Sequence, residues 1–173
     1  MTAATEATDK FHPVLIVMGV EGSGKTTVGR LLAQQLDREF RDADEFHSAP
    51  AKSKMAAGIP LTDEDRKPWL EALRQLVANH LGIGRPLVLA CSALKASYRD
   101  RLAVNPAKVV FVWLRGDIEL IRQRLQKRCG HFAGVGLLAS QFEALEEPKG
   151  AVIVDIADTP ERIVASIRSA LGL

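Results

Sequence analysis

Short apolar runs alternate with stretches of helical periodicity along most of the chain. The runs lie at residues 14–18, 87–91, 109–114 and 151–155, and a brief fifth run lies at 40–42. Runs of this length, rich in β-branched residues, are typical of buried strands. Because they are almost continuously apolar, we expect both faces of the sheet to be covered by helices. The pattern therefore predicts an α/β fold, in which helices sandwich a central sheet of five parallel strands.

The stretches between these runs carry signals for helix starts and stops. After the first run, one helical face presents apolar side chains, which are Val28, Leu31, Leu32 and Leu36. Thr62 and Asp65 form a capping box that begins a helix ending near Gly82. Thr159 begins a last helix, which ends near Leu171. We expect a polar connection between the strand at 40–42 and the capping box.

Directly after the first apolar run, residues 19–26 match the phosphate-loop pattern G-x-x-x-x-G-K-[ST]. Glycines let the backbone turn its N–H groups toward a phosphate, and the helix that follows points its positive end at the same place. Lys25 would neutralise phosphate charge, and Thr26 would offer a hydroxyl to Mg²⁺. The alternative is a glycine-rich turn without a ligand. The predicted nucleotide-binding residues are Gly19, Val20, Glu21, Gly22, Ser23, Gly24, Lys25, Thr26 and Thr27.

Composition narrows the range of partners. The chain has 173 residues, of which 47% are hydrophobic, and its formal net charge is +2. A chain of this size and hydrophobic content suits one domain, at 13–173. Its charge is too balanced for binding to duplex nucleic acid or an anionic membrane, so we expect a small-molecule partner. Two well-separated cysteines favour a reducing compartment, the cytoplasm. Residues 1–12 are polar and are predicted to be a disordered leader.

Ligands of parallel sheets bind at the carboxyl ends of the strands, which marks residues 19–26, 42–47 and 92–95 as one rim. Asp42 and Asp44 place two carboxylates beside the phosphate loop. One could hold Mg²⁺ and the other accept a proton. The alternative is an acidic pair in a solvated loop.

Basic residues and glycines follow the fourth strand, and they predict a mobile lid at about 124–140. Arg124, Arg128 and His131 lie there, with glycines at 130, 134 and 136. Guanidinium groups placed by lid closure would stabilise a phosphoryl group in transfer. The alternative is a basic helix end that only complements the helix dipole.

Further cations could hold an anionic acceptor at the rim. The candidates are Arg66, Lys95 and Arg99, while His47 and Lys54 flank a polar connection that could cover a sugar-sized ligand. Individually, each could instead be a solvated surface charge. The four histidines show no metal-binding spacing, so no metal site built from side chains is expected.

Taken together, these segments closely resemble the gluconokinase family of small P-loop carbohydrate kinases, which is similar to shikimate kinase in general build. The matching stretches cover most of the chain: M-G-V-E-G-S-G-K-T, D-A-D-E-F-H, K-M-A-A-G-I-P-L-T-D-E-D-R-K-P-W-L, A-C-S-A-L-K-A-S-Y-R-D, and G-H-F followed by L-L-A-S-Q-F-E-A-L-E. The resemblance implies ATP- and Mg²⁺-dependent phosphorylation of D-gluconate on its 6-hydroxyl, giving 6-phosphogluconate for the pentose phosphate route. It also implies a P-loop kinase fold with a closing lid, and a homodimer.

The resemblance also implies roles for individual residues. The expected catalytic residues are Lys25, Asp44, Arg124 and Arg128. Thr26 and Asp42 are expected to hold Mg²⁺, partly through water. The expected substrate-binding residues are Asp44, His47, Lys54, Arg66, Ser92, Lys95, Arg99, His131 and Gln141.

Two departures from the family pattern bear on selectivity. Glu21 replaces the usual serine, and its side chain is expected to point outward. The segment 47–51 ends in Ala51, where relatives typically have an asparagine amide that could bind a polyol. Open alternatives are a kinase for shikimate or a nucleoside monophosphate, an ATPase or switch module, and a nucleic-acid-binding module. The chain lacks the N-K-x-D motif of guanine readers, which weakens a GTPase.

Overall fold

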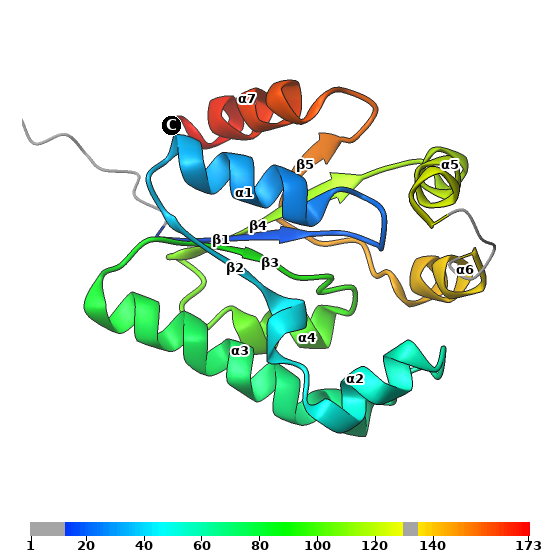
Figure 1. Ribbon diagram of the computed structural model, residues 1–173. Coiled ribbons are helices and arrows are strands. Elements are labelled where there is room, and N and C mark those ends of the chain that lie inside the picture. Colours follow the sequence, from blue (N-terminus) through cyan, green and yellow to red (C-terminus); the bar gives the residue numbers. More distant parts are fainter. Residues whose placement is uncertain (1–12, 130–134) are drawn as a thin grey trace, which may run out of the picture.

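The computed structural model describes residues 13–129 and 135–173, with the backbone alone at 128, 129, 135 and 136. Its centre is a five-stranded parallel sheet with the order β2-β3-β1-β4-β5 (Figure 1). The strands are β1 (Val14–Met18), β2 (Glu39–Asp42), β3 (Leu87–Ala90), β4 (Val109–Arg115) and β5 (Val152–Asp155). The predicted five-stranded sheet is therefore confirmed, with strand ends that differ by one residue at most.

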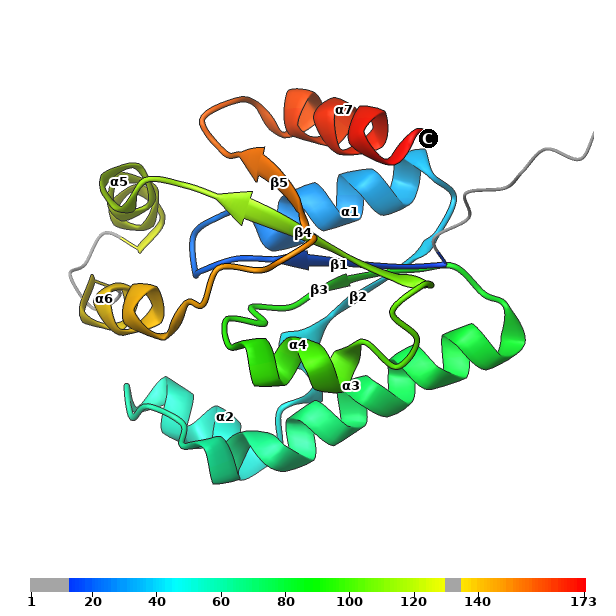
Figure 2. The same cartoon turned by 180° about the vertical axis from the view of Figure 1, so that it is seen from behind.

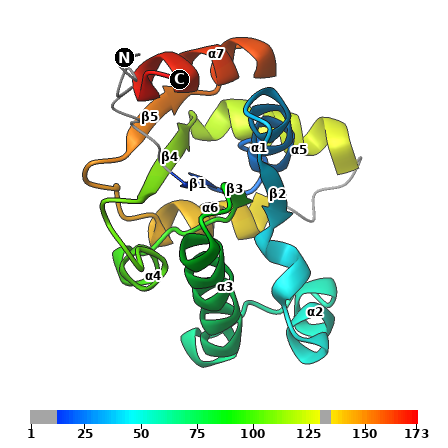
Figure 3. The ribbon, with the colours of Figure 1, turned by 90° about the vertical axis from the view of Figure 1, so that its left-hand side faces the viewer.

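Helices cover both faces of this sheet (Figures 1 and 3). Helices α1 (Lys25–Gln35) and α7 (Pro160–Leu171) lie on one face, and α3 (Asp63–Ile83) and α4 (Ala96–Leu102) lie on the other. The burial of β1 shows why its apolar run is unbroken. Leu15 and Val17 pack in the core on one face of the sheet, and Val14, Ile16 and Met18 pack in the core on the other face. The predicted three-layer sandwich is confirmed.

The remaining helices lie toward the carboxyl ends of the strands, as Figure 2 shows from behind. They are α2 (Ala49–Ala56), α5 (Ile118–Cys129) and α6 (Val135–Ala144), together with the short 3-10 helix η1 (Ala43–Phe46). Helices α5 and α6 pack side by side at this end. These elements surround the edge of the sheet where the sequence places its candidate site.

Two local features are more detailed in the structure than the sequence indicated. The connection after β2 is not simply a polar loop, since it forms η1 and α2, the latter capped by the Ser48 hydroxyl on the Ala51 N–H. Helix α3 continues past Gly82 and stops at Gly84, because Gly84 adopts the left-handed conformation with φ 66°. The Thr62–Asp65 capping box is present as predicted.

The structure describes no part of the predicted leader and only part of the predicted lid. Residues 1–12 and 130–134 lie outside the described residues, so the leader and the centre of the lid stay predictions. Within the described part of the chain, no helix is long and apolar enough to cross a membrane.

Candidate active site

The phosphate loop joins β1 to α1, and its shape depends on glycine. Gly19, Gly22 and Gly24 have φ angles of 149°, 77° and 94°, which L side chains rarely adopt. A Cβ added at Gly22 would lie 2.9 Å from the Leu125 side chain of α5. Glycine therefore lets the loop turn its backbone inward and also lets α5 pack closely on it.

Lys25 opens α1 with its side chain folded back along this loop. Its ammonium donates to the Val20 carbonyl at 3.0 Å. Burial lowers the pKa of Lys25, while the negative charges of Asp44, Glu21 and Asp42 oppose that shift. The ammonium is thus held by the loop and is partly desolvated, which strengthens its interaction with any anion that reaches it.

The end of β2 brings two aspartates next to the loop. The Thr26 hydroxyl donates to Asp42 Oδ2 at 2.8 Å, and Asp42 Oδ1 accepts the Asp44 N–H at 3.1 Å. Asp42 is therefore fixed between the start of α1 and η1, whereas the Asp44 side chain is 80% exposed. The two carboxylates are near each other, but Asp42 is held by hydrogen bonds and the Asp44 side chain is exposed. One could therefore hold a cation while the other accepts a proton.

His47 follows η1 and lies in a hydrophobic setting. Its ring stacks on Trp69 of α3 with centroids 4.8 Å apart, and Trp69 Nε1 donates to the Ala43 carbonyl at 2.8 Å. Burial lowers the pKa of His47, with Asp44 opposing the shift. Among the described residues His47 Nδ1 is buried with no hydrogen-bond partner. The other ring nitrogen, Nε2, lies 4.0 Å from Asp44 Oδ1, so Nε2 is the nitrogen that faces Asp44.

Two of the predicted acceptor cations are paired with aspartates of the first turn of α3. Lys54 binds both carboxylate oxygens of Asp65, at 2.7 and 2.9 Å. Lys95 binds both oxygens of Asp63 at 2.9 Å. The Lys54 pair, together with the capping box, lowers the pKa of Asp65 to about 2. The Lys54 ammonium thus ties α2 to α3.

Asp63 also gathers other groups around it. It accepts a short hydrogen bond from the Tyr98 hydroxyl, and Arg66 Nη1 lies 3.8 Å from its Oδ1. These donors lower the pKa of Asp63, and Asp63 in turn raises the pKa of Lys95. Lys95 and Arg66 therefore share one partly exposed carboxylate, which an anionic ligand could replace.

Arg99 is placed differently from the other predicted cations. It is 7% exposed, and its Nη1 donates to the Ala93 and Leu94 carbonyls at 2.9 and 2.8 Å. Burial lowers its pKa, and the nearby Glu146 opposes that shift. The structure thus shows the guanidinium bound to backbone, where we expected a cation free for an acceptor. Ser92 lies beside Ala93 in the segment between β3 and α4, and its backbone carbonyl accepts the Gly19 N–H at 3.3 Å.

Helix α6 reaches the phosphate loop through Gln141. Its Oε1 accepts the Glu21 N–H at 2.6 Å, so Gln141 contacts the nucleotide loop in this structure. Glu21 itself is exposed, as expected for an outward-pointing side chain. The side chain of Arg128 and all of His131 lie outside the described residues, and their proposed roles stay predictions.

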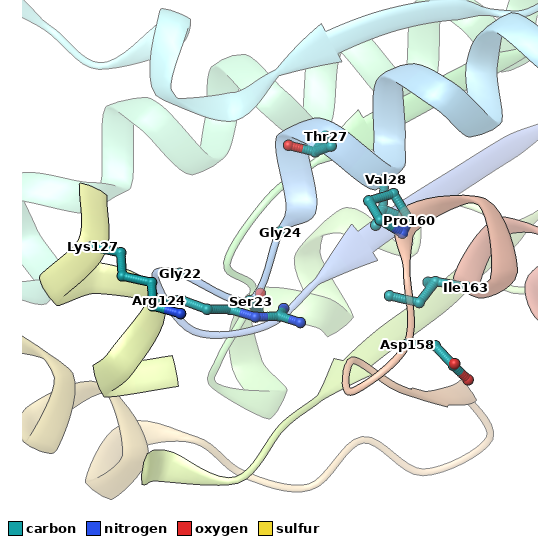
Figure 4. A pocket seen from close by; sticks show the side chains of 10 residues that line it. All are labelled: Gly22, Ser23, Gly24, Thr27, Val28, Arg124, Lys127, Asp158, Pro160 and Ile163. Carbon is teal, nitrogen blue, oxygen red and sulfur yellow. The ribbon is translucent and has the colours of Figure 1, made fainter. Parts of the chain in front are cut away.

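A hollow of about 290 Å³ opens beside the phosphate loop (Figure 4). Its lining combines the loop, α5 and the start of α7: Gly22, Ser23, Gly24, Thr27, Val28, Arg124, Lys127, Asp158, Pro160 and Ile163. Arg124 lies in its wall and donates to the Ile156 carbonyl at 2.5 Å. Sequence reasoning missed Asp158, Pro160 and Ile163, because no motif marks them and only folding brings α7 to the loop. Lys127 lies within the predicted lid, but no motif singled it out.

Comparisons with known proteins show which family the chain resembles in sequence and in fold. The family model described as shikimate kinase matches residues 21–133. The chain is 43% identical to the "probable gluconokinase" of Mus musculus, over 91% of this chain and 97% of that protein. It is 48% identical to the "thermosensitive gluconokinase" of Escherichia coli K12, over 78% of this chain and 72% of that protein. A crystal structure of a gluconokinase from Sinorhizobium meliloti superposes with a TM-score of 0.86 at 40% identity, covering 94% of this chain and 93% of that one.

Proposed function

The chain belongs to the gluconokinase family, and we infer that it transfers the terminal phosphoryl group of ATP to the 6-hydroxyl of D-gluconate. The observation that carries this inference is the hydrogen bond between Thr26 and Asp42. It brings the end of β2, with its two aspartates, against the phosphate loop, so that a nucleotide phosphate and an acceptor hydroxyl can meet there. The products are ADP and 6-phospho-D-gluconate.

The hollow in Figure 4 suits the nucleoside of ATP. Arg124 and Lys127 lie on one side of it, and Pro160 and Ile163 of α7 lie on the other. A planar base against the apolar wall would gain burial, and the cations of the facing wall would lie toward the phosphates. The phosphates would then extend along the loop toward Lys25, because Gly22, Ser23 and Gly24 line the same hollow.

Phosphoryl transfer needs positioning and charge neutralisation more than covalent chemistry. Asp44 is proposed to accept the proton of the attacking hydroxyl, since its carboxylate is exposed next to the loop. Lys25 would leave the Val20 carbonyl for the phosphates. Arg124 and Arg128 are proposed to stabilise the transferred group on closure of the lid.

The oxygen atoms of Thr26 and Asp42 fit a hard cation, because a hydroxyl and a carboxylate lie 2.8 Å apart at the loop. These two residues would hold Mg²⁺, partly through water. When bound there, Mg²⁺ would neutralise charge on the phosphate oxygens.

The acceptor is an acyclic polyhydroxy acid, so its site needs cations at one end and hydroxyl partners along its length. We propose that its carboxylate replaces Asp63 on Lys95 and Arg66. Nε2 of His47, which lies 4.0 Å from Asp44 Oδ1, would bind a hydroxyl beside that carboxylate. His131 and Ser92 complete the proposed acceptor set.

An acceptor panel tests this function. Purified protein with Mg-ATP is assayed for ADP with no acceptor, D-gluconate, shikimate, glucose and nucleoside monophosphates, and product masses are checked for added phosphate. We expect ADP above the acceptor-free rate with gluconate alone. Consumption of ATP with another acceptor, or with water, would overturn the substrate and leave the nucleotide site intact.

Two finer proposals accompany the function. We propose that the chain acts as a homodimer, as the family resemblance implies, and that it works in the cytoplasm, where ATP and a reduced Cys91 are expected. Light scattering of the full chain measures the first, and microscopy of the tagged chain measures the second.

A further inference from the structure

The loop that follows β3, residues 92–96, contacts both halves of the proposed site. At its start the Ser92 carbonyl accepts the N–H of Gly19, the first glycine of the phosphate loop. At its other end Lys95 occupies the N-cap position of α4 and binds Asp63, the carboxylate that the acceptor is proposed to replace. The conformation of this loop therefore sets where Lys95 lies relative to the nucleotide.

The conformation is an uncommon one. Ala93 has a φ of 45°, and it is fully buried. In the part of the chain that the structure describes, Asp37 is the only other non-glycine residue with a positive φ. A side chain in this region is strained, and such a residue persists only when its surroundings hold it.

Arg99 is the group that holds it. One nitrogen of its buried guanidinium donates to the carbonyls of Ala93 and Leu94, which belong to the two consecutive peptides that follow the strained residue. The segment after α6 adds to this, since the Glu146 N–H donates to the Leu94 carbonyl at 3.0 Å and its carboxylate accepts the Ala96 N–H at 2.8 Å. The loop is thus fixed from α4 and from the end of α6.

We propose that Arg99 is a positioning residue, which keeps the strained loop at 92–96 in place and thereby sets Lys95 against the nucleotide loop. It does not itself contact the acceptor. This proposal rests on the proposed function for the role of Lys95, but the conformation of the loop can be measured without any substrate.

The test combines Arg99→Lys with Ala93→Gly. Lysine keeps the charge, but its ammonium ends one bond short of the position of Nη1, so it reaches the Ala93 and Leu94 carbonyls less well and the loop loses part of its support. Glycine adopts positive φ without strain, so the loop then needs that support less. The readouts are kcat and KM for gluconate, nucleotide affinity by calorimetry, and hydrogen exchange of the peptide at 92–96 in the substrate-free protein.

We expect Arg99→Lys to speed exchange at 92–96 and to lower kcat/KM for gluconate by about 100-fold, because a small misplacement can cost that much. Affinity for ATP should change by less than about threefold, since most of the phosphate loop is untouched. The double variant should have a kcat/KM for gluconate at least about tenfold higher than that of Arg99→Lys, and slower exchange at 92–96. Ala93→Gly alone should remain active.

Other results would overturn the proposal. Lost activity with unchanged exchange, and no recovery in the double variant, would place Arg99 on the acceptor. If Arg99→Lys does not fold, the double variant is expected to fold and to turn over gluconate; a double variant that also fails to fold would make Arg99 purely structural. If the wild-type chain does not phosphorylate gluconate, the proposed function fails, while the exchange data still decide the role of Arg99 in the loop.

Discussion

The Thr26 hydroxyl donates to Asp42 Oδ2 at 2.8 Å, and this contact joins the first turn of α1 to the end of β2. The sheet order places β3 between β1 and β2, so the two residues meet only because the loops after β1 and β2 project over the same edge. A phosphate-binding element and an acidic element are thereby brought together.

Lys25→Ala should lower kcat for gluconate by at least about 1,000-fold, because charge stabilisation at the transferred phosphoryl group is lost. Circular dichroism and melting temperature should stay close to those of the wild-type chain. Lys149→Ala is the matched control, since Lys149 is an exposed lysine before the amino end of β5, at the edge of the sheet opposite the loop. Near-normal turnover in Lys25→Ala would remove this lysine from the chemistry.

Asp44→Asn should lower kcat by about 100-fold or more, the usual contribution of a general base. Affinity for ATP, measured by calorimetry, should change much less, because the Asp44 side chain is exposed and makes no hydrogen bond to the loop in the described residues. Glu45→Gln, one residue away, is the control and should retain activity. Equal losses of turnover and ATP affinity would assign Asp44 to metal binding or structure.

Asp65→Asn should destabilise the protein at neutral pH and much less in acid. The folded-state pKa of Asp65 is about 2, below its unfolded value of about 3.9. The charged carboxylate therefore stabilises the folded state above about pH 4, and this contribution is lost as the pH falls from about 4 to about 2. The measurement is the difference in Tm between wild type and Asp65→Asn from pH 7 to pH 3.

The control for that series is Glu64→Gln, because Glu64 and Lys67 form an exposed pair on the same turn of α3. It should change Tm less than Asp65→Asn does at pH 7. A Tm difference for Asp65→Asn that is the same at pH 7 and pH 3 would contradict the role given to the Lys54 pair.

Cys91 should resist thiol reagents while the protein is folded. Burial raises the pKa of its thiol to about 12, so almost no thiolate exists at pH 8, and the side chain is buried at the end of β3. In a Cys129→Ser background, labelling by Ellman's reagent should be at least about 100-fold slower than in urea. Rapid labelling of the folded chain would show that the end of β3 opens readily.

Gln141→Ala should weaken ATP binding by up to about tenfold, the equivalent of one net hydrogen bond. The amide oxygen of Gln141 accepts the Glu21 N–H, so its removal frees the phosphate loop from α6. Glu143→Gln, exposed on the same helix, is the control. If Gln141→Ala instead raises only the KM for gluconate, Gln141 acts on the acceptor, as the family resemblance implies.

Much of the fold could be predicted from the sequence, because the patterns that specify strands, helix caps and the phosphate loop are local. An apolar run such as Val14–Met18 is buried on both faces, and its residues alternate between the two cores. The phosphate loop and the Thr62–Asp65 capping box each depend on a few neighbouring residues, so their sequence patterns predicted them correctly. The end of α3 near Gly82 was predicted to within one residue, and Gly84 caps the helix because it takes the left-handed conformation.

The sequence by itself determined the order of elements, the nucleotide loop and the pair of aspartates after β2, because those features are fixed by spacing along the chain. Only the tertiary structure decided what each cation does. Lys54 is paired with Asp65, Lys95 shares Asp63 with Arg66, and Arg99 is buried on backbone carbonyls. The physical reason is that a charged side chain takes the partner that folding brings within reach, and residues distant in sequence supply that partner.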